Sequence, residues 1–262
     1  MKTFQYPSHA IKWTKERLSD CGYVVKTEKW QGIEAPDDMF EIMNHSFQMF
    51  IPQSLEELID EVKPNLPWAN QHFFERVGGL PLNPPPSHVN WPFAQKNNEQ
   101  FGGTTRFSHT YPERIWPKTA TDDINELPIE NHRGIRFDYG DLGDVIDLLE
   151  KEPFTRQAFL PIWFPEDTGV THGERVPCTI GYHFMRRDKF FHISYFIRSC
   201  DYIRHFRDDI YLAIRKLMWI LEELKKRDPE NWGNVIPGYY AMHIISLHCF
   251  NKEKGLLKLS NK

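Results

Sequence analysis

Apolar residues in the second half of the chain alternate with polar ones or run continuously, a pattern that predicts strands. Three such segments are Gln157 to Phe164, Cys178 to Met185 and Phe190 to Ser199, all rich in β-branched and aromatic residues. The polar tetrapeptide at 186–189 joins the last two segments, so they are expected to form an antiparallel hairpin. A final strand is predicted from about Tyr239 to Phe250.

Apolar residues at helical spacing predict three clear helices. The first, Ser54 to Val62, begins with a capping box of Ser54 and Glu57. The second, Asp141 to Glu150, ends before a proline, and the third runs from about Tyr202 to Lys226 with an apolar stripe along one side. The remainder of the first third of the chain is expected to be helical with irregular joints.

The segment from Leu80 to Pro117 is rich in proline and aromatic residues, which excludes regular helix. We expect a long ordered loop region, and loops of that length in compact domains are usually functional. Strands and helices segregate along the chain, which predicts an α+β fold with a bent mixed sheet flanked by helices. With 262 residues, 40% of them hydrophobic, the chain has enough apolar material for one core. We expect a single domain, helical and loop-rich over 1–150, with the sheet and long helix over 151–250.

The net charge of −4 provides no broad basic field, so no nucleic acid partner is expected and an anionic ligand must be held by a few arginines. The amino terminus lacks the apolar core of a signal peptide, and the stretch from Tyr239 to Phe250 is too short to cross a bilayer. The four cysteines stand far apart and are expected to be reduced. These features predict a cytoplasmic protein without membrane contact.

Cys178 is the best candidate for a nucleophile. It follows Pro177 at the start of a predicted strand, with Arg175 nearby and Arg198 on the paired strand, and such surroundings favour a thiolate. The alternative is that Cys178 is a small apolar residue of the sheet.

A pattern of residues around Cys178 resembles the thymidylate synthase family. Pro177-Cys178 is followed by a hairpin and then by Arg198-Ser199-x-Asp201 ahead of a long helix, while FRDDIYLAIRKL at 206–217 is similar to the deoxycytidylate hydroxymethylase branch. Upstream, Thr155-Arg156 resembles the family's Ser-Arg-Arg phosphate motif, and Ser246-Leu247-His248 resembles its sugar-binding strand. The resemblance spans about Phe154 to Phe250 and implies a thymidylate synthase-like fold.

This resemblance implies that Cys178 attacks C6 of a pyrimidine nucleoside monophosphate, so that C5 becomes a nucleophile toward the one-carbon unit of 5,10-methylenetetrahydrofolate. Arg198 would hold the 5′-phosphate, and Ser199, Asp201 and His248 would bind the nucleotide. Asp201 would also contact the folate.

The resemblance further implies a homodimer in which Arg156 reaches the phosphate site of the other subunit. Gln157 stands where the family has a second arginine, which weakens that contact. Phe250 replaces the family's sugar-binding tyrosine, so the choice between deoxyribose and ribose stays open.

Asp209 occupies the place of the asparagine that reads uracil in thymidylate synthases. A carboxylate accepts from the 4-amino group of cytosine and can share a proton with N3, which points to a cytosine nucleotide. Two alternatives remain: Asp208 reads the base instead, or Asp209 is an ordinary acid in the first turn of a helix.

Three upstream residues complete the implied site. Glu75 would be the catalytic glutamate, Tyr111 the active-site tyrosine, and Trp91 would stack on the pterin ring. The alternatives are a surface ion pair for Glu75 and a core or loop anchor for Trp91.

The expected function is 5-hydroxymethylation of dCMP, and the resemblance suggests a bacteriophage enzyme. The sequence stops soon after Phe250, without the closing segment of thymidylate synthases, and a more open site favours water over hydride as the final reactant. Methylation of dCMP, thymidylate synthesis from dUMP, and a non-catalytic nucleotide- or RNA-binding relative are the alternatives. No metal is expected, because His243 and His248 have no cysteine pair at ligand spacing.

Overall fold

The computed structural model describes residues 1–30, 33–93, 107–119, 121–122, 127–128, 140–168 and 175–258. Its centre is a seven-stranded mixed sheet in the order β1-β5-β11-β10-β9-β8, with β2 paired to β5. The strands of this sheet are β1 (Lys2–Phe4), β2 (Tyr23–Val25), β5 (Met39–Phe50), β8 (Phe159–Pro161), β9 (Thr179–Arg187), β10 (Phe190–Asp201) and β11 (Ile236–Phe250). Two small hairpins are formed by β3 (Lys29–Trp30) with β4 (Ile33–Glu34) and by β6 (Thr121–Asp122) with β7 (Leu127–Pro128).

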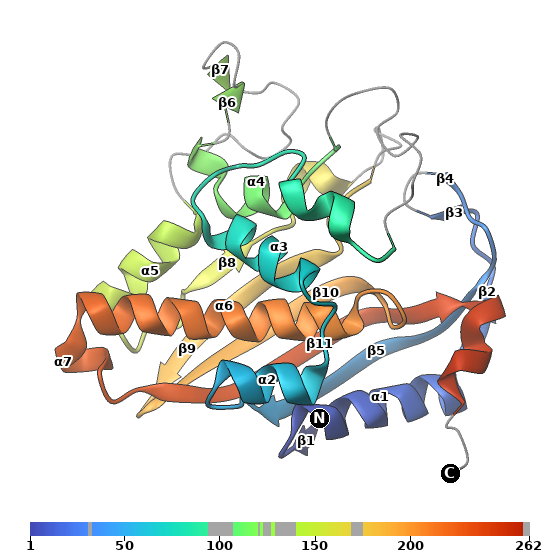
Figure 1. Cartoon of the computed structure of the whole chain (residues 1–262), viewed down its shortest axis with the longest axis horizontal. Coiled ribbons are helices and arrows are strands. Elements are labelled where there is room, and N and C mark those ends of the chain that lie inside the picture. The colour runs from blue at the N-terminus through green and yellow to red at the C-terminus, as the bar shows by residue number, and fades with distance from the viewer. Residues whose placement is uncertain are drawn as a thin grey trace.

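Helices α1, α2, α3 and α6 all lie in front of the sheet in Figure 1, on one of its two faces. The helices are α1 (Pro7–Cys21), α2 (Leu55–Val62), α3 (Trp68–Val77), α4 (Tyr111–Ile115), α5 (Leu142–Lys151), α6 (Phe206–Arg227) and α7 (Pro229–Trp232). The predicted α+β fold in a single domain, a mixed sheet flanked by helices, is therefore confirmed. Within the described ranges, no helix has the length and apolar character needed to cross a bilayer.

The predicted hairpin is present as β9 and β10, which pair antiparallel through a tight turn in which Asp188 has a positive φ of 53°. The chain then crosses through α6 and returns as β11, which lies parallel to β10 and antiparallel to β5. The strand predicted from Gln157 is shorter than expected, because only Phe159–Pro161 pairs with β9.

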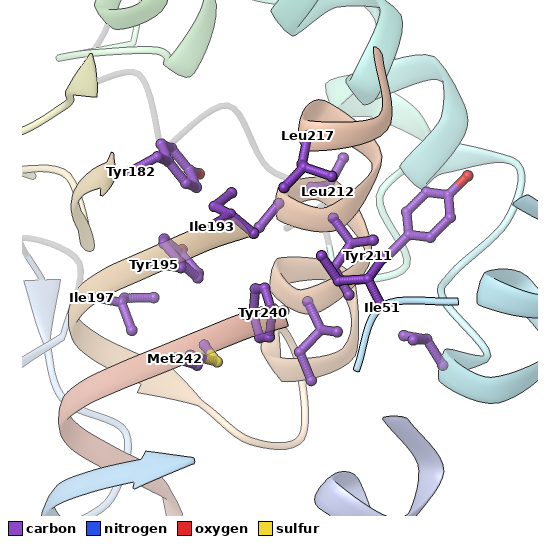
Figure 2. Close-up of a cluster of buried hydrophobic side chains, with 14 of the residues drawn as sticks. Ile51, Tyr182, Ile193, Tyr195, Ile197, Tyr211, Leu212, Leu217, Tyr240 and Met242 are labelled. Carbon is purple, nitrogen blue, oxygen red and sulfur yellow. The ribbon is translucent and has the colours of Figure 1, made fainter. Parts of the chain in front are cut away.

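The core lies between α6 and the strands beneath it. Ile193, Tyr195 and Ile197 of β10 point toward α6, beside Tyr240 and Met242 of β11 (Figure 2). Their alternation along β10 buries every second side chain, as a strand with one covered face requires. Predicted to start at Tyr202, α6 begins only at Phe206, because the Asp201 carboxylate accepts from the N–H groups of Ile203 and Arg204 and holds a turn there.

Helices α2 and α5 are confirmed, with Ser54 and Asp141 at their N-caps. The prediction for the first third of the chain is wrong in one important respect, since β5 is a long strand that pairs with β1, β2 and β11. Between Leu80 and Pro117 the structure has a 3₁₀ turn at Pro86–Asn90 and the short helix α4, and residues 94–106 lie outside the described part of the chain.

Candidate active site

The ends of three strands bring the predicted nucleotide-binding residues to one edge of the sheet. Asp201 at the end of β10 pairs with His248 near the end of β11, and Ser199 pairs with Ser246. Because β9 runs antiparallel to β10, its beginning lies at the same edge, where the Arg198 backbone N–H donates to the Cys178 carbonyl at 2.8 Å. Pairing in the sheet therefore assembles residues that are far apart in the sequence.

Cys178 is half-buried, immediately before β9. Burial raises the pKa of its thiol above the ordinary value, although Arg198 and Arg175 both act to lower it. The expectation that the surroundings of Cys178 favour a thiolate is wrong for the free protein. The two arginines act in the expected direction, but the loss of solvent around the sulfur outweighs their positive charge.

Arg198 is held by backbone carbonyls next to the cysteine. Its Nε donates to Pro177 O at 3.1 Å and its Nη2 to Val176 O at 3.3 Å, while its guanidinium carbon lies 5.3 Å from the centre of the Trp163 ring. Because the guanidinium fork is planar, these two bonds fix its orientation beside the Cys178 backbone.

Asp209 and Asp208, adjacent in the first turn of α6, have different surroundings. Asp208 is bound to Asn65, whose backbone and side-chain N–H groups donate to it at 2.8 and 2.7 Å. Asp209 instead receives the Tyr195 hydroxyl at 3.4 Å and the Cys200 thiol at 3.6 Å. Burial raises the pKa of Asp209 to about 7, against an opposing effect of Arg76. Of the two acids, Asp209 is therefore the one directed toward the cysteine side of α6.

Tyr111 and Asp209 lie at the two ends of a series of hydroxyl groups. The Tyr111 hydroxyl is 3.0 Å from Thr179 Oγ1, which is 2.8 Å from the Tyr195 hydroxyl, the donor to Asp209. Arg76 covers the Tyr111 ring, with 4.0 Å between its guanidinium carbon and the ring centre. This series links α4, β9, β10 and α6 directly behind Cys178.

Glu75 is separated from Tyr111 by one side chain. His72 Nδ1 donates to Glu75 at 3.1 Å, and the His72 ring meets the Tyr111 ring edge-on. Ser87 donates to the same carboxylate from its backbone at 2.6 Å and from its hydroxyl at 2.5 Å. Burial raises the pKa of Glu75, but the hydrogen bonds from His72 and Ser87 outweigh it and hold the pKa below its ordinary value. Glu75 is thus a half-buried carboxylate held by His72 and Ser87, and not an exposed surface ion pair.

Two predicted residues at the strand ends are already engaged in networks. The Asp201 carboxylate accepts from Arg204 at 3.0 Å, and Arg204 also holds Glu253 through both guanidinium nitrogens. His248 Nδ1 lies 3.2 Å from Ser246 Oγ, which donates to Glu41 of β5. These contacts fix the positions of Asp201 and His248 on the two neighbouring strands.

Trp91 lies at the same side of the molecule, stacked on His205 with ring centres 4.9 Å apart and planes inclined by 17°. Its indole Nε1 is buried and has no hydrogen-bond partner among the described residues. A cleft next to Phe93 is lined by basic and aromatic side chains: Lys15, Lys63, Tyr202, Arg204 and Arg207. Trp91 is therefore half-buried: its ring packs against His205, and part of the side chain stays accessible to solvent.

Arg156 is the predicted residue that the fold keeps apart from the others. Its side chain is exposed, and its carbonyl bonds to His183 in the interior of β9. His183 lies five residues further along the chain than Cys178, which is roughly 17 Å at about 3.3 Å per residue. Within one chain, Arg156 does not reach the cysteine.

Four residues of this site were missed by the sequence interpretation as chemical groups: Arg76, Thr179, Tyr195 and Cys200. Tyr195 alternates with isoleucines and therefore reads as core, and it is indeed only 1% exposed. The one available signal was its hydroxyl, because a buried tyrosine needs a hydrogen-bond partner. Among the described residues, no group of three or more His, Cys, Asp or Glu side chains is placed to hold a metal ion.

Comparisons with known proteins identify the fold. Neither protein-family models nor curated protein sequences give a match. Among solved structures, the chain is similar to thermostable thymidylate synthase A from Bacillus subtilis, with a TM-score of 0.64 over 97% of this chain and 83% of that one. The fold is similar to that of thymidylate synthase. Only 11% of residues are identical, so the likeness establishes the architecture, and the function must be argued from the site.

Proposed function

We propose that this chain is a folate-dependent transferase that adds a one-carbon unit to C5 of a cytidine monophosphate, in the first instance dCMP 5-hydroxymethyltransferase. The observation that carries the proposal is Asp209, a half-buried acid beside the Tyr195 and Thr179 hydroxyls, next in the sheet to Cys178. The thymidylate synthase-like fold supports one-carbon transfer to a pyrimidine nucleotide as the general reaction.

The state of Asp209 supports cytosine as the base. A group whose pKa is about 7 exists in both protonation forms at neutral pH. It accepts from the 4-amino group of cytosine, and it holds or releases a proton at N3 at little cost. A uracil edge offers an N3–H donor and an O4 acceptor, and a carboxylate repels O4. Asp208 is committed to Asn65 and is the weaker candidate.

Cys178 would supply the covalent step. Its sulfur, after losing the thiol proton, bonds to C6, and the electron pair of the 5,6 double bond moves to C5, which then forms the new carbon–carbon bond. Loss of the C5 proton is followed by departure of tetrahydrofolate from the transferred carbon, and water adds to that carbon to give the hydroxymethyl group. Release of sulfur from C6 then restores the aromatic base. Because burial raises the pKa of Cys178, the thiol must be deprotonated within the complex, and Arg198 and Arg175 stabilise the thiolate as it forms.

The phosphate and the folate have matching groups. Arg198 is oriented at the cysteine by two backbone bonds, and a guanidinium suits a phosphate dianion. For the folate, the half-buried Trp91 ring and the basic lining of the neighbouring cleft fit an aromatic ring system that carries carboxylates. When bound, 5,10-methylenetetrahydrofolate supplies the one-carbon unit. Trp91 and Asp201 would orient it, while Glu75 and Tyr111 would manage proton transfer near the base.

A homodimer is part of the proposal, because the sheet face opposite α6 carries partly exposed aromatic rings. Phe196 of β10 stacks on His243 of β11, and His192 stacks on Tyr239. Phe159 and Phe190, at 39% and 36% exposure, extend this surface. A contiguous apolar sheet face is typical of an interface, and a second copy would bring Arg156 toward the phosphate of its partner.

The test is incubation of the purified chain with methylenetetrahydrofolate and each of dCMP, CMP and dUMP, followed by mass analysis of nucleotide and folate. The expected product is dCMP carrying one hydroxymethyl group, together with tetrahydrofolate. A methylated product with dihydrofolate would indicate the methyltransferase, and turnover of dUMP alone would indicate a thymidylate synthase. Nucleotide binding without any product from any of the three would contradict the enzyme proposal and indicate a binding protein.

A further inference from the structure

Two hydroxyl groups, those of Tyr195 and Thr179, connect the carboxyl of Asp209 to the phenolic hydroxyl of Tyr111. The oxygen–oxygen distances are 3.4 Å from Tyr195 to Asp209 Oδ1, 2.8 Å from Thr179 to Tyr195, and 3.0 Å from Tyr111 to Thr179. Tyr195 and Thr179 are 1% and 0% exposed, so solvent does not reach the two middle residues of the series. Each hydroxyl has one proton to donate, and its oxygen can accept.

Because each hydroxyl has one proton, the protonation state of Asp209 decides which group is the donor in every hydrogen bond of the series. When Asp209 is a carboxylate it can only accept, so Tyr195 donates to Asp209, Thr179 donates to Tyr195, and Tyr111 donates to Thr179. The Tyr111 oxygen then presents lone pairs to a bound ligand. When Asp209 is protonated it can donate to Tyr195, the other two bonds reverse, and Tyr111 points its O–H outward.

We propose that Tyr195 and Thr179 act as positioning residues that make the Tyr111 hydroxyl a donor or an acceptor according to the proton held at Asp209. Recognition of the base at Asp209 would thereby set the hydrogen-bond character of the group at the far end of the series. This consequence for catalysis rests on the proposed function, whereas the coupling itself is a property of the free protein. No bond to carbon is made or broken, and no proton is gained or lost by the three hydroxyls.

The surroundings of Asp209 are suited to this role. Burial raises its pKa to about 7, so both directions of the series are populated near neutral pH. Among the described residues, the other ionisable groups that act on Asp209 come from six elements: Arg76 of α3, Tyr111 of α4, Cys178 and Tyr182 beside or on β9, Tyr195 and Cys200 of β10, Asp208 of α6 and Tyr240 of β11. Of these, Arg76 carries the positive charge, and Tyr195 and Cys200 make direct hydrogen bonds.

The test is a pH titration of the Asp209 carboxyl by NMR in the full-length protein labelled with ¹³C at its aspartates, the Asp209 signal being assigned by its loss in Asp209→Asn. Tyr195→Phe removes the direct hydrogen-bond donor to Asp209. In this variant the titration midpoint of Asp209 is expected to rise by about half a pH unit. Thr179→Val should raise the midpoint in the same direction although Thr179 does not touch Asp209. Thr179→Ser, which keeps a hydroxyl, should restore the wild-type midpoint.

Tyr240→Phe is the matched control. Its hydroxyl is buried near Asp209 but has no hydrogen-bond partner among the described residues, so removing it leaves the series intact. An unchanged midpoint in Thr179→Val, or an equal shift in Tyr240→Phe, would overturn the coupling. Should Thr179→Val fail to fold, the comparison of Thr179→Ala with Thr179→Ser decides the question, because only the first lacks the hydroxyl. Failure of the proposed function is seen separately, as a lack of any product from the three nucleotides, and leaves the titration result intact.

Discussion

Asp208 holds Asn65 at two points: its Oδ1 accepts from the Asn65 backbone N–H at 2.8 Å, and its Oδ2 accepts from the side-chain amide at 2.7 Å. Asn65 lies just before α3, so this pair joins α6 to the segment that leads into the helix carrying Glu75 and Arg76. Successive residues of a helix point about 100° apart, and Asp209 is consequently free to face the hydroxyl series. Two adjacent acids thus have separate tasks, one structural and one chemical.

Asp208→Ala should destabilise the fold without changing substrate preference. Its removal leaves the Asn65 amide groups unpaired in a part-buried position, a loss of about 1.5–3 kcal/mol for charged hydrogen bonds. Urea denaturation of variant and wild type measures this. Asp147→Ala is the control, because that acid pairs with Arg227 on the exposed surface and should cost about 0.5 kcal/mol or less.

Asp209→Asn should shift the preference from the cytosine to the uracil nucleotide. The amide offers a donor for O4 and an acceptor for N3–H, and each mispaired buried group costs about 1–3 kcal/mol. The measurement is the ratio of kcat/KM for dCMP over dUMP. A ratio identical to that of the wild type would remove Asp209 as the base reader, and with it the choice of a cytidylate substrate.

The same substitution should change how stability depends on pH. Asp209 has an ordinary pKa of 3.8 when unfolded and a pKa of about 7 in the fold. Between these values the folded state retains a proton that the unfolded state has lost, so this group makes stability fall as pH rises from about 4 to 7, by about 4 kcal/mol at most. Asp209→Asn lacks this contribution and should gain stability relative to wild type over that window. Parallel stability curves for the two proteins would contradict the raised pKa.

Cys178→Ser should abolish turnover while nucleotide binding survives. A serine hydroxyl keeps the shape of the side chain but is a far weaker nucleophile near neutral pH. Cys21→Ser, at an exposed cysteine, serves as control. Turnover of Cys178→Ser within tenfold of wild type would exclude the covalent mechanism.

Arg198→Ala should weaken nucleotide binding by about 1.5–3 kcal/mol, the range for a charged hydrogen bond. The nucleoside without phosphate provides the control, since its affinity should change little. Arg198→Lys keeps the charge but not the fork that bonds to Pro177 and Val176, and it should recover only part of the loss. Equal affinity of the wild type for nucleotide and nucleoside would contradict the phosphate assignment.

The elements that could be predicted are those whose local signals agree. The polar tetrapeptide at 186–189 and the alternation on either side give the β9–β10 hairpin, and Asp141 followed by an apolar stripe gives α5. Strand β5 could not be predicted in this way. Its first buried residues, Met39, Ile42 and His45, are three apart, a helical spacing, and Asn44 in the left-handed region with φ 54° interrupts the alternation. Pairing on both sides determines this strand, and its longest partner, β11, lies about 200 residues further along the chain.

In the candidate site, too, some residues could be placed from local sequence signals and others could not. Cys178, Arg198 and Asp201 stand near recognisable strand ends, so their meeting follows from the hairpin. The hydroxyl series could not be predicted in this way, because its residues meet only if a particular face of β9 and β10 lies under α6. The thiolate expected from neighbouring arginines was wrong for a related reason, since sequence reveals charge but not the degree of burial that opposes it.

Tyr195 lies between Ile193 and Ile197 on the strand that α6 covers (Figure 2). Its ring stacks on that of Tyr182 with 4.8 Å between the ring centres, and its hydroxyl donates a hydrogen bond to Asp209. One side chain therefore belongs both to the packed interior and to the chemistry. Attempts to alter the base preference by randomising residues at the rim of the site would leave Tyr195 and its buried neighbours unchanged. Libraries built in the apolar interior beneath α6, screened for nucleotide selectivity as well as folding, would be the productive place to evolve this protein.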